Sequence, residues 1–553
     1  MSTIQQTTKE PIIEPAIKQR FWGSLFVALC LFELCCLLIV ALSPLPELHL
    51  SGSPLATSWR WTLLPSHLLL TILGSSAAQW WIAPSLLGLA LLGLSGTYAY
   101  TIRRVLRFSK DENADRRWLF LLLVGAIVYS LTLLFQPMLF SDDIFSYIFS
   151  GRILAVYHAD PLNTAPIQFS TDPYLQWVIS GRNAPNLYGP LWYCLASLFV
   201  SVGGSQVTTL LLFKGAAILS HLANTVLVWC ILERVAPRRR VLGTLLYAWN
   251  PLVLIEVAGS GHNEGVLLTL LLLATWFYVL RNGSWSRLGT LLLFGLALST
   301  NLIVSLLAPL LIWFDVRTER HIPRALWGFC WRALLVLVPA LVIWLPFWRG
   351  ASTFFAITSA IDMQHFVHSP IGTLVGPTHG FFRLVAYVLR FPPFLQPIPA
   401  ADVTLRGSAT FIFALIYSNM FGQVRHAPTT LAGMRYSPSA DEAMEMPGFD
   451  VLLRAWNIAA FAYLVLVSGW FWPWYLLWML WIVVLRRFDT FTSTMLVLSG
   501  TALFFYLFMG LTGVSIALYQ PALIFGLPLV YLAIVKGRHR RTERTDLVYE
   551  QRS

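Results

Sequence analysis

Long apolar runs set the main constraint on this chain. Runs of about 20 residues with hardly a charge recur along it, the first at residues 21–43. A helical run of this length matches the ~30 Å hydrocarbon core of a bilayer, whereas barrel strands alternate over about 10 residues. Only 12% of the 553 residues are charged, against about 25% in a soluble domain. The sequence therefore predicts an all-α polytopic membrane protein with about 12–14 transmembrane helices.

Most basic residues lie in short clusters between the apolar runs. The net charge is +12, and the clearest cluster lies at residues 103–117. Loops rich in Lys and Arg stay on the cytoplasmic side of a membrane. The charge pattern thus predicts membrane lipids as partners rather than nucleic acid, and it places the loop after residue 138 on the outer side. The six cysteines fall in apolar stretches without metal-ligand spacing, so we interpret them as core residues.

Parity of the apolar runs gives the predicted organisation. A cytoplasmic tail (residues 1–20) precedes the integral membrane domain (21–538), and a basic cytoplasmic tail (539–553) ends the chain. Two large outer loops, at about 139–206 and 348–404, and one cytoplasmic insert, at about 422–450, interrupt the membrane domain. Both termini are expected in the cytoplasm. Residues 187–203 could span, but the aromatics in this run favour a helix at the outer interface.

Two adjacent carboxylates, Asp142 and Asp143, open the first outer loop directly after an apolar run. Neighbouring carboxylates repel, so the pKa of one rises while the other stays ionised, and such a pair can supply a general base for a hydroxyl. One alternative is a helix N-cap, a role that Asp often takes. Another is oxygen ligation of a divalent metal, although no other acidic residue lies near in sequence. We predict both residues as catalytic candidates and assign no metal ligand.

Other polar residues are expected at the same outer edge. A polar group beside the bilayer is costly, which makes it a candidate for function. Arg152 and Lys214 are candidate ligands of a phosphate, and snorkelling to the interface is the alternative for each. Tyr188 is a candidate substrate contact at the end of the loop's polar 183–188 stretch.

A Gly-rich turn precedes His262, Asn263 and Glu264, which begin the next apolar run. The N-terminus of a helix together with a His and an Asn can bind an anionic or sugar group. The alternative is a plain turn in which Asn263 caps the helix. We keep the three residues as candidates for substrate binding.

Two more groups complete the predicted outer face. The spacing of His365 and His368 would suit a metal on a helix, but no third ligand is in sight, so a phosphate contact or ordinary loop histidines are favoured. Trp474 and Tyr475 have the composition of an interfacial aromatic belt and could also stack on a sugar or a prenyl chain.

The main rival class is a transporter or lipid flippase. Such a protein would carry ionisable residues at mid-bilayer and paired broken helices from internal repeats. This chain has its polar residues at the predicted outer edge and shows no such repeat. We therefore favour an enzyme, with a polytopic transporter or flippase as the alternative.

Several stretches resemble bacterial GT-C glycosyltransferases, and within them the polyprenol-phosphate-mannose-dependent alpha-mannosyltransferases. They occur in the family's order between about residues 120 and 490. They are residues 141–152 (SDDIFSYIFSGR), 160–166 (DPLNTAP), 187–192 (LYGPLW), 249–251 (WNP) with 261–264 (GHNE), and 473–478 (PWYLLW).

The resemblance implies a GT-C-type bundle in the cell membrane that transfers a sugar, mannose, with inversion. The donor would be a polyprenyl-phosphate-linked sugar and the acceptor a lipid-linked or cell-envelope glycan on the outer face. The acidic residue of the first outer loop acts as base in these enzymes; Asp143 matches that position best and Asp142 is the second choice. No cofactor is implied, and a leaving group that is already a phosphate does not require a divalent metal, although it does not exclude one.

Three positions depart from the family pattern. Glu264 stands where relatives usually have Asp, and Asn301 stands where a Lys often precedes a Pro by about eight residues. The usual Asn-Pro-Tyr of the first loop reads Asp-Pro-Leu at residues 160–162.

Overall fold

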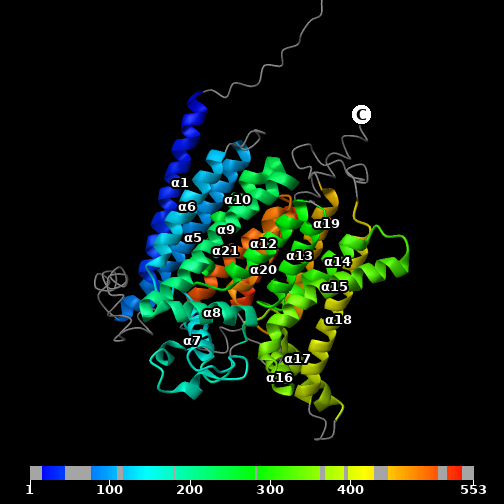
Figure 1. Cartoon of the computed structure of the whole chain (residues 1–553). Helices are drawn as coiled ribbons and strands as arrows, with labels where there is room; N and C mark the ends of the chain where they lie inside the picture. Colours follow the sequence, from blue (N-terminus) through cyan, green and yellow to red (C-terminus); the bar gives the residue numbers. More distant parts are fainter. Residues whose placement is uncertain are drawn as a thin grey trace, which may run out of the picture.

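The computed structural model describes residues 15–43, 76–108, 116–179, 181–185, 187–280, 283–360, 368–390, 397–428, 446–508 and 520–537. Within these ranges the chain is helical, and an isolated bridge between His368 and Trp470 is the only β pairing. Long helices run side by side as a bundle, and shorter helices and loops gather at its lower end in Figure 1. The predicted class, an all-α polytopic membrane protein, is confirmed.

Nine helices of the described residues are long and apolar enough to cross a membrane. Helical geometry pairs the backbone N–H and C=O groups within each segment, as a bilayer requires, and apolar side chains suit the surrounding lipid. They comprise α1 (Pro15–Leu42), α5 (Ser76–Phe108), α6 (Arg116–Leu134), α9 (Gln206–Val235), α15 (Ile322–Trp344), α18 (Pro397–Arg425), α19 (Pro447–Leu466), α21 (Thr490–Ala502) with η9 (Leu503–Phe508), and the helix Gln520–Gly537.

A bent pair of helices brings the number of candidate spans to ten, where the sequence predicted about 12–14. Five apolar helices in the described ranges fall below the length of a full span. They are α8 (Pro190–Gly203), α12 (Glu264–Leu280), α13 (Ser284–Leu298), α14 (Val304–Val316), and α20 (Leu477–Leu485) with the 3₁₀ turn η8 (Pro473–Leu476).

The break between the two helices of the bent pair positions the candidate active site. The turn η3 (Pro237–Arg239) and α10 (Arg240–Ala248) form the pair's first half, and α11 (Pro251–Val253) with the π-helix η4 (Leu254–Gly259) forms its second half at 44° to the first. Pro251 cannot continue a helix from the preceding turn because it lacks an N–H. The Asn250 side chain accepts the N–H groups of Leu252 and Val253, so it restarts the helix as an N-cap.

The segment between α6 and α9 covers the lower end of the bundle. It contains α7 (Asp143–Ala155), the turns η1 (Pro166–Phe169) and η2 (Leu175–Trp177), and α8. In Figure 1, α8 lies across the end of the long helices beside α7. Its 14 residues reach only about 21 Å, less than the ~30 Å hydrocarbon core. This is the arrangement expected of an interfacial helix.

A close backbone approach fixes α8 on the bundle. The N–H of Gly189 donates to the carbonyl of Thr300, and the N–H of Leu191 donates to that of Ser299. A Cβ on Gly189 would lie 2.1 Å from the Ser299 carbonyl oxygen, so only glycine fits there.

Two large apolar cores hold the arrangement, and a third, small cluster joins Leu162, Tyr193 and Phe347. The larger runs through the bundle, and the smaller lies under α7, α8 and η2, with Tyr147, Trp177 and Trp192 almost fully buried. The loop segment therefore folds against the bundle as a packed unit.

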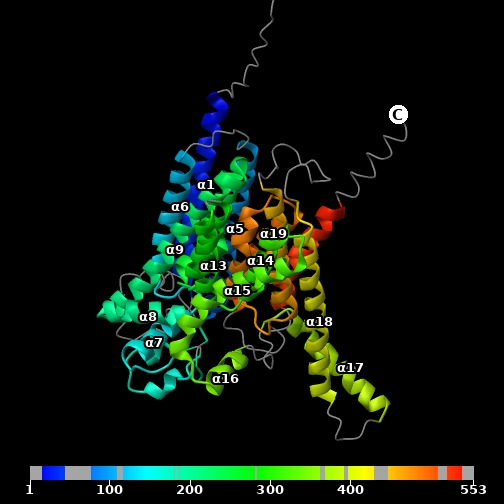
Figure 2. The ribbon, with the colours of Figure 1, turned by 45° about the vertical axis from the view of Figure 1, so that its right-hand side comes forward.

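The second large loop is partly helical. It contains α16 (Ala351–Ala360), the turn η6 (Ile371–Leu374) and α17 (Val375–Val388), and the turn η5 (Leu345–Phe347) leads into it from α15. Figure 2 shows α17 and the lower part of α18 projecting beyond the bundle. The sequence predicted a returning span near 409–421; that run lies inside α18, which begins twelve residues earlier at Pro397.

Candidate active site

The start of α7 presents Asp143 at the edge of the buried core. Asp143 is the first residue of the helix, and its N–H donates to Ser141 Oγ at 3.2 Å. A carboxylate in the first turn of a helix is stabilised by the free N–H groups there. The Asp143 side chain is 18% exposed, so it keeps access to a substrate.

Asp142 occupies the N-cap position, but its side chain makes no capping hydrogen bond. The capping role considered for it from the sequence is therefore absent. Asp142 instead adds a negative charge beside Asp143.

The turn after η4 brings His262 to the same place. Gly261 has φ of +78°, a left-handed conformation that favours glycine, and it turns the chain from η4 into α12. The His262 N–H donates to the carbonyl of Glu256 at 3.1 Å, which closes the turn. A π-helix often marks a functional site because it displaces side chains from the regular register.

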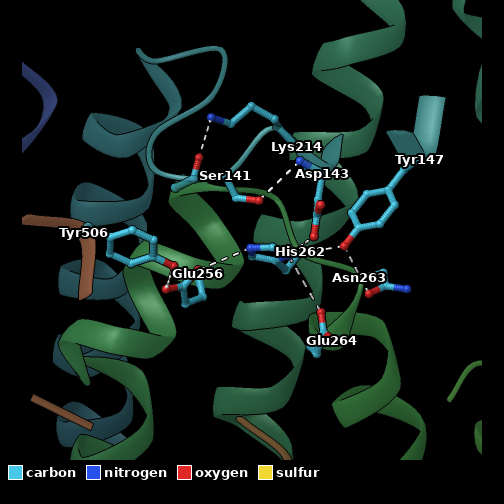
Figure 3. Close-up of polar contacts among 10 residues, drawn as sticks. Ser141, Asp143, Tyr147, Lys214, Glu256, His262, Asn263, Glu264 and Tyr506 are labelled. Carbon is cyan, nitrogen blue, oxygen red and sulfur yellow. Dashed lines mark hydrogen bonds and ion pairs between the residues drawn. The ribbon is translucent and has the colours of Figure 1, made fainter. Parts of the chain in front are cut away.

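The His262 imidazole lies at the centre of an acidic cluster, shown in Figure 3. Its Nδ1 is 3.2 Å from the Tyr147 hydroxyl, 3.6 Å from Asp143 Oδ2 and 3.9 Å from Glu264 Oε2. Its Nε2 is 3.3 Å from Glu256 Oε2. One ring thus faces three carboxylates, which come from α7, η4 and α12.

Glu256 is the principal residue that the sequence interpretation missed. Its side chain is fully buried, and its Oε1 accepts a hydrogen bond from the Tyr506 hydroxyl of η9 at 2.5 Å. The available signal was a lone acidic residue inside the apolar stretch 252–258, since a charge in a predicted span is a candidate for function. Tyr147 and Tyr506 carried no such signal because tyrosine is common in apolar helices.

Burial and neighbouring charges set the protonation of the cluster. Burial raises the pKa of Asp143 to about 6; His262 opposes this rise, while Asp142 and Glu256 add to it. For His262, burial lowers the pKa, but contact with Glu256 and the charges of Asp143 and Glu264 outweigh burial, so the net shift is upward. The site therefore favours an imidazolium next to a carboxylate that titrates near neutral pH.

Aromatic rings support the cluster from two sides. Trp474 of η8 stacks on His262 with ring centroids 4.1 Å apart, and Trp472 stacks on Trp474 at 5.0 Å. Tyr188 packs edge-on against Tyr147 at 4.6 Å. The predicted residues Trp474 and Tyr188 thus lie in or beside the cluster.

Asn263 and Tyr475, which were also predicted as substrate-binding candidates, have less direct contacts with His262. Asn263 is half-buried and its Oδ1 accepts a hydrogen bond from Tyr147 at 3.4 Å. Tyr475 stacks on Trp478 at 4.3 Å and meets its neighbour Trp474 edge-on, at the side of the cluster.

The structure places Arg152 outside this cluster. Its Nε donates to Asp172 Oδ2 at 2.8 Å, and its guanidinium lies 4.1 Å from the ring centroid of Tyr174. The Tyr157 hydroxyl donates to the same oxygen, Asp172 Oδ2. Arg152 thus ties the first loop together.

Lys214 lies near the cluster but holds the backbone. Its fully buried Nζ donates to the carbonyls of Gln136 and Gly259, the latter at 2.8 Å, with Leu133 O at 3.5 Å. These carbonyls lie at or just beyond the C-terminal ends of α6 and η4, where helices leave acceptors unpaired. Lys214 thereby joins the segment that leads to Asp143 to the turn that carries His262, and Figure 3 shows its side chain beside both residues.

The two histidines predicted as a pair, His365 and His368, have different outcomes. His365 lies outside the described residues. His368 packs edge-on against Trp472 and Phe505, at 5.6 and 4.9 Å, so an aromatic stack connects it to Trp474 and His262. Among the residues that the structure describes, no group of three or more His, Cys, Asp or Glu side chains has the arrangement of a metal site.

Chemically, the cluster joins a partly exposed carboxylate to a buried charged imidazole. Asp143 can take a proton from a bound hydroxyl, and the imidazolium stabilises the ionised carboxylate before it does so. Such an arrangement suits a reaction in which a hydroxyl group attacks.

Comparison with protein families agrees with this chemistry. A search of curated proteins finds no match to the chain. Residues 51–317, which include α7, the bent helix pair and His262, match the family model described as alpha-(1->6)-mannopyranosyltransferase, N-terminal domain. Over these residues, just under half of its length, the chain is similar to the alpha-(1->6)-mannopyranosyltransferases, a family of GT-C-type mannosyltransferases.

Proposed function

We propose that the protein transfers mannose from a polyprenyl-phosphate-mannose donor to a lipid-linked or cell-envelope glycan on the outer face of the membrane, with inversion at C1. The acceptor hydroxyl attacks C1 of mannose, the C1–O bond to the phosphate breaks, and polyprenyl phosphate leaves. The hydroxyl proton passes to Asp143. The observation that carries the proposal is the Asp143 carboxylate, partly exposed at the head of α7 and 3.6 Å from the buried His262.

The surroundings support a lipid-linked donor. The cluster lies at the lower end of a bundle of apolar helices (Figure 2), where a prenyl chain can lie among side chains while its phosphate stays at the edge. The family description supplies an α-linked product; inversion then requires a β-linked donor.

The test uses membranes that contain the protein, with an acceptor glycan and polyprenyl-phosphate-mannose labelled in the sugar. We expect label in a glycan product that α-mannosidase releases and β-mannosidase does not. A parallel incubation with labelled nucleotide-mannose, in membranes lacking polyprenyl phosphate, should give no product. Transfer from the nucleotide sugar alone would contradict the donor assignment, and label that crosses the membrane without forming a glycosidic bond would favour a transporter or flippase.

A further inference from the structure

The buried contact between Glu256 and His262 has features that would support the function of Asp143 as the base, in addition to stabilising the fold. Glu256 Oε2 and His262 Nε2 are 3.3 Å apart, and both side chains are fully buried. Neither atom has a hydrogen-bond partner elsewhere in the described part of the chain. Burying either group unpaired would cost several kcal/mol, so the two satisfy each other, with His262 Nε2–H facing the carboxylate.

The pair fixes which side of the imidazole faces the base. With Nε2 held by Glu256 and the ring stacked on Trp474, Nδ1 is left to face Asp143. The Tyr506 hydroxyl donates to the other oxygen of Glu256, so both carboxylate oxygens have a partner and the side chain is held in place. The chain of contacts thus runs from Tyr506 through Glu256 and His262 to Asp143.

Several titratable groups surround the imidazole, and three of them, Glu256, Asp143 and Glu264, favour its charged form. The titratable groups on the surrounding elements are Asp142, Asp143 and Tyr147 of the α7 region, Glu256 of η4, Glu264 of α12, and Tyr506 of η9, with Tyr188 and Lys214 close behind. Of the three carboxylates that face the ring, Glu256 is the only one on the Nε2 side and makes the shortest contact. It therefore contributes most to holding the ring charged, in line with the upward net shift in the pKa of His262.

We propose that Glu256 is a positioning residue for the transfer reaction: its buried ion pair with Nε2 keeps His262 charged and turned toward Asp143, and so sets the pH range in which Asp143 can accept a proton. This inference rests on the proposed function of Asp143 as the base. Removing the negative charge of Glu256 leaves His262 neutral at moderate pH, and Asp143 then loses its neighbouring cation. Asp143 would hold its proton to higher pH, and the acid limb of the activity profile would move upward.

The experiment compares wild type with Glu256→Gln and with a matched control, Glu33→Gln. Glu33 is a half-buried carboxylate of α1 whose oxygen accepts a hydrogen bond from Thr132, so its replacement also exchanges a membrane carboxylate for an amide. Label transfer per folded protein is measured across pH. We expect the acid limb of the pH–rate profile of Glu256→Gln to lie about one pH unit higher than that of wild type. On this limb the transfer rate, relative to the variant's own alkaline plateau, should be about tenfold lower than in wild type. The acid limb of Glu33→Gln should coincide with that of wild type.

A uniform loss at every pH, with the limb unmoved, would show a merely structural role and overturn the inference. Tyr506→Phe serves if Glu256→Gln does not fold. Without the hydroxyl the carboxylate is a weaker counter-ion, so the limb should move in the same direction by less. Glu256→Asp keeps the charge and should restore the wild-type limb position at a reduced rate.

A second readout separates this inference from the proposed function. The charge of His262 is followed by NMR of histidine-labelled protein, with its signal identified by its loss in His262→Gln. We expect the imidazole of wild type to stay charged to higher pH than that of Glu256→Gln. Equal titration in both would overturn the role of Glu256, whereas a wild-type protein that transfers no label would contradict the proposed function and leave the NMR outcome to stand by itself.

Discussion

Two clusters of charged side chains at the lower end of the molecule are built from similar groups but balance their charges differently. In the loop cluster, one cation, Arg152, meets one carboxylate, Asp172, and hydroxyl and backbone N–H donors satisfy the rest of that carboxylate. In the His262 cluster, one imidazole faces three carboxylates. In the loop cluster every charge of the carboxylate is compensated, whereas an excess of carboxylates around one cation is an arrangement that shifts pKa values and is typical of active sites. The comparison therefore distinguishes a structural cluster from the cluster proposed to be catalytic.

The largest expected effect on stability comes from breaking the balanced cluster. Arg152→Met leaves the fully buried Asp172 carboxylate without its cation, which should cost about 3 kcal/mol in the free energy of unfolding. Label transfer per folded protein should stay within about threefold of wild type. Thermal unfolding in detergent measures the first effect, and Arg182→Met, an exposed arginine of the same loop, is the control. An unchanged melting temperature would contradict a structural role for Arg152.

Lys214→Met should have the next largest effect. Its ammonium donates to backbone carbonyls at the ends of two helices, and losing charged hydrogen bonds of this kind costs about 2 kcal/mol. Because the same contacts align the segments that carry Asp143 and His262, the rate should also fall, at all pH values alike. Lys536→Met at the exposed end of the last helix is the matched control. A shift of the acid limb instead of a uniform loss would place Lys214 among the groups that titrate with the base.

The pH dependence of the wild-type rate sharpens the comparison further. Asp143 must be ionised to accept a proton, and its pKa is raised to about 6. The rate should therefore be steady above that pH and fall about tenfold per unit below it. A steady-state transfer assay with the rate normalised to folded protein measures this. A rate unchanged down to pH 4.5 would mean that no group with a raised pKa limits the reaction.

Asp142→Asn should have the smallest effect. Its side chain makes no capping hydrogen bond, and its charge raises the pKa of Asp143. Removing that charge should lower the pKa of Asp143 slightly and change the transfer rate at pH 7.5 by less than about threefold. A loss of more than a hundredfold would move the base assignment to Asp142.

Much of the fold was predictable because membranes impose simple rules. Continuous apolar runs predicted the all-α bundle, and the two carboxylates after the run at residues 119–138 indicated Asp142 and Asp143 as candidates. The resemblance to mannosyltransferases then favoured Asp143 over Asp142. The number of full spans was overestimated because α8, α12, α13, α14 and α20 are apolar but short.

The site was only partly predictable because its partners are distant along the chain. His262 and Trp474 stood in recognisable polar or aromatic stretches, but their stacking joins residues more than 200 positions apart. Glu256 was overlooked because its neighbours in sequence are apolar and its partner Tyr506 lies 250 residues away. Arg152 and Lys214 were predicted to bind a phosphate. The charge pattern of the sequence does not reveal that a loop carboxylate pairs with Arg152 and that carbonyls at helix ends pair with Lys214.

The rate of label transfer by Asp143→Asn, per folded protein at pH 7.5, tests the central claim most directly. The substitution keeps the size of the side chain and removes its capacity to accept the hydroxyl proton. The account predicts a rate about 10²–10⁴-fold below wild type, with the melting temperature retained. A rate within threefold of wild type would contradict the assignment of Asp143 as the base.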